Sequence, residues 1–325
     1  MPLLARRALL ATLGASLAPR CGAAAGDPFS AWLADFRAEA RGRGIDRRTL
    51  DLALGSISPL DSVIDADRRQ PERRMTFEEY RRRVVSLDRI DRGRELLAQH
   101  ASLLQRVESR YGVPSEVMVA LWGIESNFGE RQGSYDVFAA LATLAYEGRR
   151  ASLFRRELLS ALEIAHRGYA DVGTMQGSWA GAMGQNQFMP STYLGYAVDF
   201  DGDGRKDIWN SLPDVFASMA NYLSRAGWDA RYIWGREVIA PPEISEKRVG
   251  LDQRAPLTTW RQRGVRLPDG GGLPEAEIPA SLLRLDDDER ASFLVYGNFR
   301  ALMAWNRSTY FGVSVGLLSD SLRDG

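Results

Sequence analysis

The chain has few of the residues that build metal centres and covalent nucleophiles. It contains one cysteine, Cys21, and two histidines, His100 and His166. This excludes a zinc site with several cysteine or histidine ligands, and it excludes a cysteine nucleophile in the body of the protein. A serine triad would need one of the two histidines, and neither lies in a segment with a nucleophile elbow. We interpret both histidines as structural.

The chain also lacks net charge. Its 42 Lys and Arg residues equal its 42 Asp and Glu residues in number, so no overall field attracts nucleic acid or anionic lipid. With 325 residues, of which 45% are hydrophobic, it is long enough to bury a substantial core. We therefore expect a globular monomer without a nucleic-acid partner, built as one large domain or two closely packed ones.

The amino-terminal apolar run, residues 8–18, is too short to span a membrane. It follows Arg6 and Arg7 and precedes three small residues at 23–25, which is the pattern of a signal peptide. We expect residues 1–25 to be removed after export to the periplasm, by the general or the twin-arginine route. Lipid anchoring at Cys21 is disfavoured because Arg20 replaces the small residue that precedes a lipidated cysteine.

Most of the remaining chain has the periodicity of helices. Thr76 and Glu79 have the spacing of a capping box, and apolar residues recur at helical spacing through residues 29–55, 87–110, 135–146, 151–165 and 212–225. From residue 234 the pattern breaks into short segments, with brief strands at 281–286 and 292–295. Helical patterns return at 301–306 and 310–318. The fold class predicted is α+β, mainly α.

This pattern divides the chain after the signal peptide into four parts. We expect a helical arm and linker over residues 26–75 and a helical core over 76–233. A small β-rich subdomain follows at 234–300, and C-terminal helices at 301–325 pack back on the core.

The segment from Val117 to Gly129, VMVALWGIESNFG, is apolar at helical spacing and carries a single carboxylate, Glu125. Pro114 suits the first turn of this helix and Gly129 suits its end. Glu125 is then near the helix C-terminus, where apolar neighbours and the negative end of the helix dipole both raise a carboxyl pKa. Such a group suits a general acid at neutral pH. The alternative is a terminal Glu that reaches water or an arginine.

The segment from Gly177 to Tyr196, GSWAGAMGQNQFMPSTYLGY, bears several glycines. It lacks the Lys-Ser/Thr ending and the preceding strand of a phosphate loop, so nucleotide binding is disfavoured. Ser178, Gln187 and Phe188 supply a hydroxyl, an amide and an aromatic surface, which together suit a neutral polysaccharide. The alternative is a turn whose polar side chains satisfy its own backbone.

The segment DFDGDGRKDIW resembles a calcium-binding loop. Asp199, Asp201 and Asp203 occupy its first, third and fifth positions, and Gly204 occupies the sixth, where a sharp turn is needed. Arg205, at the seventh position, can ligate through its backbone carbonyl. We therefore expect an EF-hand-like loop over residues 199–214 that holds a structural Ca²⁺, or Na⁺ in its place.

The last ligand of this loop is open from the residues alone. The twelfth position is Asn210 where an EF-hand has a bidentate Glu. Asp214 is the candidate replacement, but it also ends Ser211-Leu-Pro-Asp214, which has the spacing of a capping box. A ligand role and a helix-cap role can coexist.

These three segments together resemble the membrane-bound B type of lytic murein transglycosylases. YGVP at 111–114, SLLRLD at 281–286 and YGNF at 296–299 extend the resemblance, which covers about residues 70–322. It implies a lysozyme-like helical core and cleavage of the β-1,4 bond between N-acetylmuramic acid and N-acetylglucosamine in peptidoglycan. It also implies a Ca²⁺ loop closed by an acid slightly later than usual, which Asp214 matches after one inserted residue.

The resemblance further implies a catalytic role for Glu125 and a set of substrate-binding residues. Trp305 and Asn306 fall where the family has a Tyr-Asn pair in the cleft, so the aromatic type is changed while a stacking surface is kept. The substrate-binding residues expected in this chain are Tyr80, Arg149, Arg150, Ser178, Gln187, Phe188, Tyr222, Trp305 and Asn306. The partners implied are peptidoglycan glycan strands, and other cell-wall enzymes are compatible with this role.

No second carboxylate stands out at a cleft motif, which favours a mechanism in which the substrate supplies the second group. Glu125 protonates the leaving oxygen and then accepts the proton of the muramyl 6-hydroxyl, which gives a 1,6-anhydro product without water. One alternative is a hydrolytic muramidase of the same fold with Glu130, Asp136 or Glu147 as the base. The other is a non-catalytic, calcium-stabilised peptidoglycan-binding protein.

Overall fold

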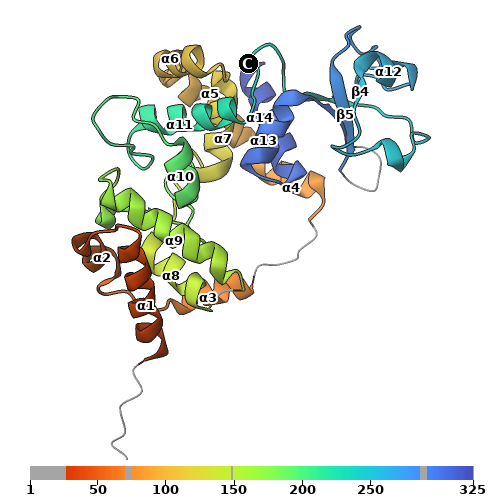
Figure 1. The fold of residues 1–325 in the computed structure, drawn as a ribbon. Coiled ribbons are helices and arrows are strands. Elements are labelled where there is room, and N and C mark those ends of the chain that lie inside the picture. Colours follow the sequence, from red (N-terminus) through yellow and green to blue (C-terminus); the bar gives the residue numbers. More distant parts are fainter. Residues whose placement is uncertain (1–26, 70–74, 148, 286–290, 325) are drawn as a thin grey trace, which may run out of the picture.

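The computed structural model describes residues 27–69, 75–147, 149–285 and 291–324. The predicted signal peptide and Cys21 lie outside these residues. Within them, the chain forms a helical body with an N-terminal arm on one side and a small sheet on the other (Figure 1). No helix of this part of the chain combines the length and the apolar character that crossing a membrane requires. The fold class predicted from the sequence, mainly helical α+β, is confirmed.

The arm consists of three helices that share a hydrophobic core with the middle of the chain. Asp27 and Asp46 cap the first two helices by accepting hydrogen bonds from Phe29 N and Thr49 N. Phe36 and Leu50 of the arm are buried in one cluster with residues of α8 and α9. The elements concerned are α1 (Pro28–Gly42), α2 (Arg47–Leu54), α3 (Asp61–Arg68), α8 (Val137–Glu147) and α9 (Ala151–His166).

The helical body is centred on α7 (Ser115–Ser126), which is apolar on nearly all faces and therefore packs on every side. The predicted capping box forms at the start of α4, where Thr76 and Glu79 bond reciprocally. The prediction of a single helix over residues 87–110 is wrong. The helix is interrupted at His100, whose ring lies near those of Trp122 and Phe216. The other helices here are α4 (Phe77–Val84), α5 (Leu87–Gln99), α6 (Ala101–Tyr111), α11 (Leu212–Arg225) and α14 (Thr309–Arg323).

The small sheet has four antiparallel strands in the order β3-β6-β5-β4 and a hydrophobic core of its own. The strands are β3 (Gly235–Val238), β4 (Ala255–Pro256), β5 (Pro279–Arg284) and β6 (Ser292–Val295). A 3₁₀ turn, η2 (Glu246–Arg248), and α12 (Leu257–Gln262) belong to the same subdomain. The chain then returns to the helical body through α13 (Gly297–Trp305), as Figure 1 shows.

The segment between α9 and α11 is mostly loop. It contains η1 (Val172–Thr174), β2 (Gln176–Gly177) and α10 (Pro190–Tyr196). The short strand β2 pairs antiparallel with β1 (Tyr135–Asp136), which directly precedes α8. Glu157 of α9 accepts hydrogen bonds from Ser191 N and Ser191 Oγ, which holds the start of α10 against α9. The glycine-bearing segment is joined to α7 separately, through the hydrogen bond from Trp122 Nε1 to Gln185 Oε1.

Candidate active site

Glu125 lies in the last turn of α7. The chain leaves the helix in the left-handed region, with φ of 51° at Asn127 and 58° at Phe128. A bulky residue such as phenylalanine rarely adopts this conformation, and the packing around it must hold it there. The chain therefore makes a sharp, strained turn that begins two residues after Glu125.

The ring of Phe128 folds back over α7 at Gly123. A Cβ atom at Gly123 would lie 2.7 Å from Cε1 of Phe128, so this position requires glycine. The same ring makes an edge contact with Trp122, with 5.5 Å between centroids. The aromatic side chain thus fixes the loop after Glu125 to the helix that carries it.

Gln185 ties the glycine-bearing segment to α7 from within the protein. Its Oε1 accepts a hydrogen bond from Trp122 Nε1 at 2.7 Å, and its Nε2 donates to Trp209 O at 2.7 Å. Gln187 adds a second tie, because its Nε2 donates to Gln132 O at 3.0 Å. These hydrogen bonds hold the glycine-bearing segment against α7 and the loop that follows it.

Glu125 accepts a hydrogen bond from Trp305 Nε1 at 2.6 Å through its Oε1. Its side chain keeps an intermediate exposure to solvent, while desolvation by the surrounding protein raises its pKa to about 7. The Trp305 hydrogen bond acts in the opposite direction on this pKa. Burial, and then the nearby charge of Glu125, raise the pKa of the Tyr80 hydroxyl, which places Tyr80 in the electrostatic surroundings of the acid.

Aromatic rings form a cluster beside Glu125. The Trp305 ring lies 4.9 Å from that of Tyr222 and 5.2 Å from that of Phe188, between centroids. The Tyr222 hydroxyl donates to Ala304 O at 2.6 Å and so braces the end of α13. Phe188 is only 2% exposed and lies within the core, whereas Trp305 and Tyr222 are partly exposed. Phe188 supports the partly exposed rings, and its substrate contact stays a prediction.

Two further predicted substrate residues satisfy the backbone of their own turns. Ser178 Oγ accepts from Ala182 N at 3.1 Å, and Asn306 Oδ1 accepts from Ser308 N at 3.0 Å. Asn306 is exposed directly after Trp305, and Ser178 is partly exposed. The bonds of Ser178 match the alternative of a self-satisfied turn, and both substrate contacts stay predictions.

Arg149 and Arg150 are exposed in the turn between α8 and α9 and are paired with the arm. Their guanidinium groups lie 3.7 Å and 3.5 Å from the carboxylate of Asp67 in α3, which is 6% exposed. Arg149 Nη2 also donates to Asp67 O at 3.1 Å. The structure therefore links these arginines to α3, and their contact with substrate stays a prediction.

The candidate bases of a hydrolytic mechanism are held by other groups or lie on the surface. Glu130 accepts from Asn127 Nδ2 at 2.6 Å, and Asp136 accepts from Ala139 N at 2.8 Å near the start of α8. Glu147 is exposed at the C-terminal end of α8.

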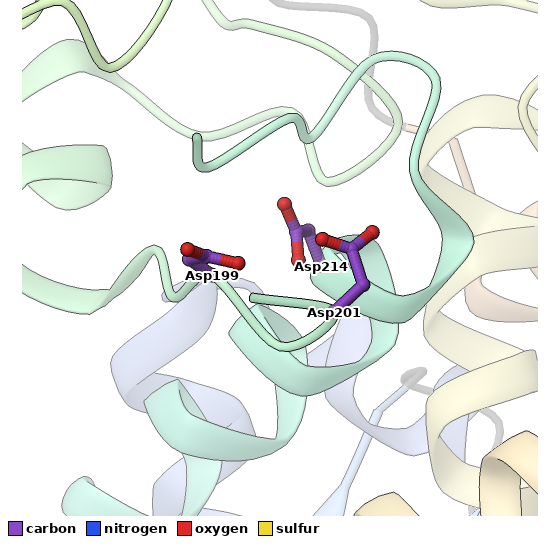
Figure 2. Close-up of side chains that lie close together, drawn as sticks. All are labelled: Asp199, Asp201 and Asp214. Atoms are coloured by element: carbon purple, nitrogen blue, oxygen red, sulfur yellow. The ribbon is translucent and has the colours of Figure 1, made fainter. Parts of the chain in front are cut away.

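Three carboxylates converge where the acidic loop meets the start of α11. One oxygen from each of Asp199, Asp201 and Asp214 lies within 4.8 Å of the others, and Figure 2 shows the three groups gathered there. Such a set of hard oxygen donors suits Ca²⁺ or another hard cation. Burial, and then the charges of Asp201 and Asp199, raise the pKa of Asp214 to about 6, and a cation between them would offset that repulsion.

Two other loop residues lie differently from their predicted ligand roles. The carboxylate of Asp203 accepts a hydrogen bond from Arg205 N at 2.8 Å and is not part of the converging set. The side chain of Arg205 pairs with Asp171 at 2.6 Å. Their ligand roles stay predictions.

Asp214 does not complete the predicted capping box. Ser211 Oγ accepts weakly from Asp214 N at 3.4 Å and caps α11, but the Asp214 carboxylate accepts from Phe200 N and Asp207 N, each at 2.7 Å. The buried carboxylate thus faces the acidic loop and not the helix start.

The model of the family "Transglycosylase SLT domain" matches residues 28–320 of this sequence. The chain belongs to this family. It is 32% identical over 293 residues to membrane-bound lytic murein transglycosylase B of Escherichia coli (strain K12). The alignment covers 86% of this chain and 79% of that relative. The resemblance drawn from the sequence motifs is confirmed.

Solved structures of this transglycosylase family share the fold. SltB3 of Pseudomonas aeruginosa, in complex with NAG-NAM-pentapeptide, has a TM-score of 0.89 at 44% identity over 92% of this chain and 81% of that one. The same protein has been solved with NAG-anhNAM-pentapeptide. The Escherichia coli lytic transglycosylase SLT35, in complex with calcium, has a TM-score of 0.76 at 30% identity over 93% of this chain and 95% of that one.

Two site residues of this transglycosylase were missed in the sequence. Gln185 lies in the same Gln-Asn-Gln-Phe run as Gln187, and its place two residues before Gln187 was the only available signal. Arg89 of α5 donates to Val84 O at 2.7 Å and to Asn127 Oδ1 at 3.3 Å, which ties the end of α4 to the residue after α7. Arg89 stands in an ordinary charged helix, so the sequence carries no signal for it.

Proposed function

We propose that this chain is a lytic transglycosylase that cleaves the β-1,4 bond between N-acetylmuramic acid and N-acetylglucosamine in peptidoglycan. The observation that carries this proposal is the state of Glu125, a partly exposed carboxyl whose pKa is raised to about 7 by desolvation. Its only hydrogen-bond partner within the described residues is a neutral donor, Trp305 Nε1. Such a carboxyl exists in both ionisation states near neutral pH.

Both states are needed in a cleavage that uses one carboxyl group. As an acid, Glu125 donates its proton to the oxygen that leaves from the muramyl C1. As a base, it then accepts the proton of the muramyl 6-hydroxyl while that oxygen bonds to C1 and closes the 1,6-anhydro ring. The acetamide oxygen of the sugar supplies the second group that a paired carboxylate supplies elsewhere. The family membership and the relatives' ligands support this chemistry.

The surroundings of Glu125 support a sugar substrate. The partly exposed rings of Trp305, Tyr222 and Tyr80 offer apolar surfaces for sugar faces. A polar cavity of about 610 Å³ borders the loop after Glu125 and is lined by residues 129–134, 173–174, 176 and 209–210. Amide, carboxylate and backbone groups in this cavity suit the hydroxyl and acetamide groups of a glycan strand.

We further propose that Asp199, Asp201 and Asp214 hold a structural Ca²⁺ with no part in the chemistry. Their convergence supports this, as does the calcium complex of SLT35.

We also propose that the chain works in the periplasm as a monomer on glycan strands. The description of its Escherichia coli relative as membrane-bound supports a site of action at the cell envelope.

The proposal is tested with Glu125→Gln, which removes the titrating proton and keeps the size and the acceptor for Trp305. Cleavage of purified peptidoglycan should fall by at least about 100-fold, the scale of general acid-base catalysis. The comparison variant is Glu130→Gln, which should leave kcat within about twofold even where KM rises, because Glu130 lines the cavity but holds no reacting proton. A folded Glu125→Gln protein that still cleaves would overturn the assignment, and a loss of kcat in Glu130→Gln would point to the hydrolytic alternative.

A further inference from the structure

A second cavity lies where the small sheet meets the N-terminal end of α13. Its volume is about 200 Å³. One part of its wall is apolar, from Tyr232, Ile278, Pro279 and Val295. Two arginines, Arg254 and Arg300, also line it, together with Ser281, Tyr296 and Gly297. Tyr232 is 39% exposed, so part of its ring is accessible to a ligand.

The two arginines make the cavity positive. Arg300 is fixed, because its Nη2 donates to Leu251 O at 2.5 Å and lies 3.4 Å from Ser281 Oγ. Arg254 is exposed and has no hydrogen bond or ion pair with any residue that the structure describes. Burial, and then the charge of Arg254, lower the pKa of Arg300, while Asp252 acts in the opposite direction. Two guanidinium groups that repel each other favour an anion between them.

The start of α13 adds to this preference. Gly297 is the first residue of the helix, and no side chain caps its backbone N–H groups. A Cβ atom at Gly297 would meet nothing within 4 Å, so the space above the helix start is open. Unpaired N–H groups and the positive end of the helix dipole favour a negatively charged group there.

The cavity and the candidate acid lie at opposite ends of one helix. α13 runs from Gly297 at the cavity to Trp305, which donates to Glu125. Nine helical residues rise about 12 Å along the axis. A peptide of five residues spans at most about 17 Å when extended. An extended stem of five residues is therefore longer than the helix that joins Trp305 to the cavity.

We propose that this cavity binds the terminal carboxylate of the stem peptide carried by the muramyl sugar. This rests on the proposed function and adds to it a preference for stems that end in a free carboxylate over stems whose terminal carboxyl is converted to an amide. The arginines and the helix start bind the carboxylate, and the apolar wall contacts the side chain of the terminal residue. The ligand complex of SltB3 with NAG-NAM-pentapeptide supports a substrate of this kind.

The first test measures binding without cleavage. A free stem pentapeptide and its C-terminal amide are titrated by calorimetry into the Glu125→Gln protein and into Glu125→Gln with Arg254→Gln. The acid should bind about tenfold more tightly than the amide, because a charged hydrogen-bond pair is lost with the amide. Arg254→Gln should reduce binding of the acid to the level of the amide. Equal binding of acid and amide to the Glu125→Gln protein in which Arg254 is retained would overturn the proposal.

The second test measures the effect on catalysis. Arg254→Gln should raise KM about tenfold on glycan strands with free pentapeptide stems, and the increase should be absent on strands stripped of peptide. The matched control is Arg248→Gln, an exposed arginine of the same subdomain outside the cavity, which should leave both KM values unchanged. Equal KM changes on both strands, or none on either, would overturn the proposal. A wild-type protein that binds the acid but cleaves neither strand would overturn the proposed function alone.

Discussion

The hydrogen bond from Trp305 to Glu125 determines which carboxyl oxygen carries the proton. An indole N–H only donates, so Oε1 must accept, and the acidic proton is left for Oε2. Oε2 is then the oxygen that faces the leaving group in the proposed reaction. Trp305 is a positioning residue in this account, because it acts on the substrate through Glu125 as well as through its ring.

Trp305→Phe tests this role through the pH profile. Glu125 must be protonated to act as an acid, so kcat/KM should fall as the pH rises through about 7. The indole N–H lowers the pKa of Glu125, and its removal should raise that pKa and move the alkaline limb of the profile to higher pH. Trp305→Tyr, which keeps a ring with a donor, should restore the limb at least in part. An unchanged alkaline limb in Trp305→Phe would contradict the role.

The exit from α7 is the element that positions the site. Glycine at 123 leaves room for the Phe128 ring, and the ring holds a left-handed turn directly after Glu125. Gln185 and Gln187 then fasten this turn to the glycine-bearing segment. The geometry of the acid therefore depends on the packing of Phe128 on Gly123 and on the hydrogen bonds of Gln185 and Gln187.

Gly123→Ala should damage both stability and activity. The new methyl group would displace the Phe128 ring, and overpacking of this kind costs about 1–3 kcal/mol of unfolding free energy. The turn after Glu125 should shift with the ring, so kcat should fall as well. The matched control is Gly195→Ala in α10, where a Cβ meets nothing within 4 Å and where alanine should not destabilise. Full activity and wild-type stability in Gly123→Ala would show that the turn does not depend on Phe128.

Local patterns predicted these elements well, because capping residues and apolar spacing act within a few residues. The capping box at Thr76 and the helix over 212–225 appear as predicted. The pattern did not predict the break at His100, where the ring lies near Trp122 and Phe216 of two helices that are distant in the sequence. It also could not show that Asp214 turns away from its own helix start, because its partners lie in the preceding loop.

The site is assembled at the scale of the whole molecule. Glu125 and Trp305 are 180 residues apart and meet because α13 returns from the small sheet to the helical body. The family resemblance predicted roles for both residues, but no local sequence pattern predicted the hydrogen bond between them. For the same reason the pairing of Arg149 and Arg150 with Asp67, across 82 and 83 residues, was not predictable from the turn that contains them.

A cation at the acidic loop should stabilise the whole chain. Binding to the native state alone raises the unfolding free energy by about 2.7 kcal/mol when Ca²⁺ exceeds its Kd about 100-fold. The melting temperature should therefore rise with Ca²⁺ and return with a chelator. Asp201→Asn should reduce the Ca²⁺-dependent rise, whereas Asp203→Asn, outside the converging set, should reduce it less. A melting temperature that responds neither to Ca²⁺ nor to the chelator would contradict a cation site.

The central claim is that Glu125 closes a ring on the substrate and does not activate water. Products of peptidoglycan cleavage made in heavy-oxygen water and weighed by mass spectrometry test it directly. The account predicts muropeptides that are lighter by one water than the hydrolytic products and that carry no heavy oxygen, because the muramyl 6-hydroxyl replaces water at C1. Reducing-end products that carry heavy oxygen from the solvent would contradict it.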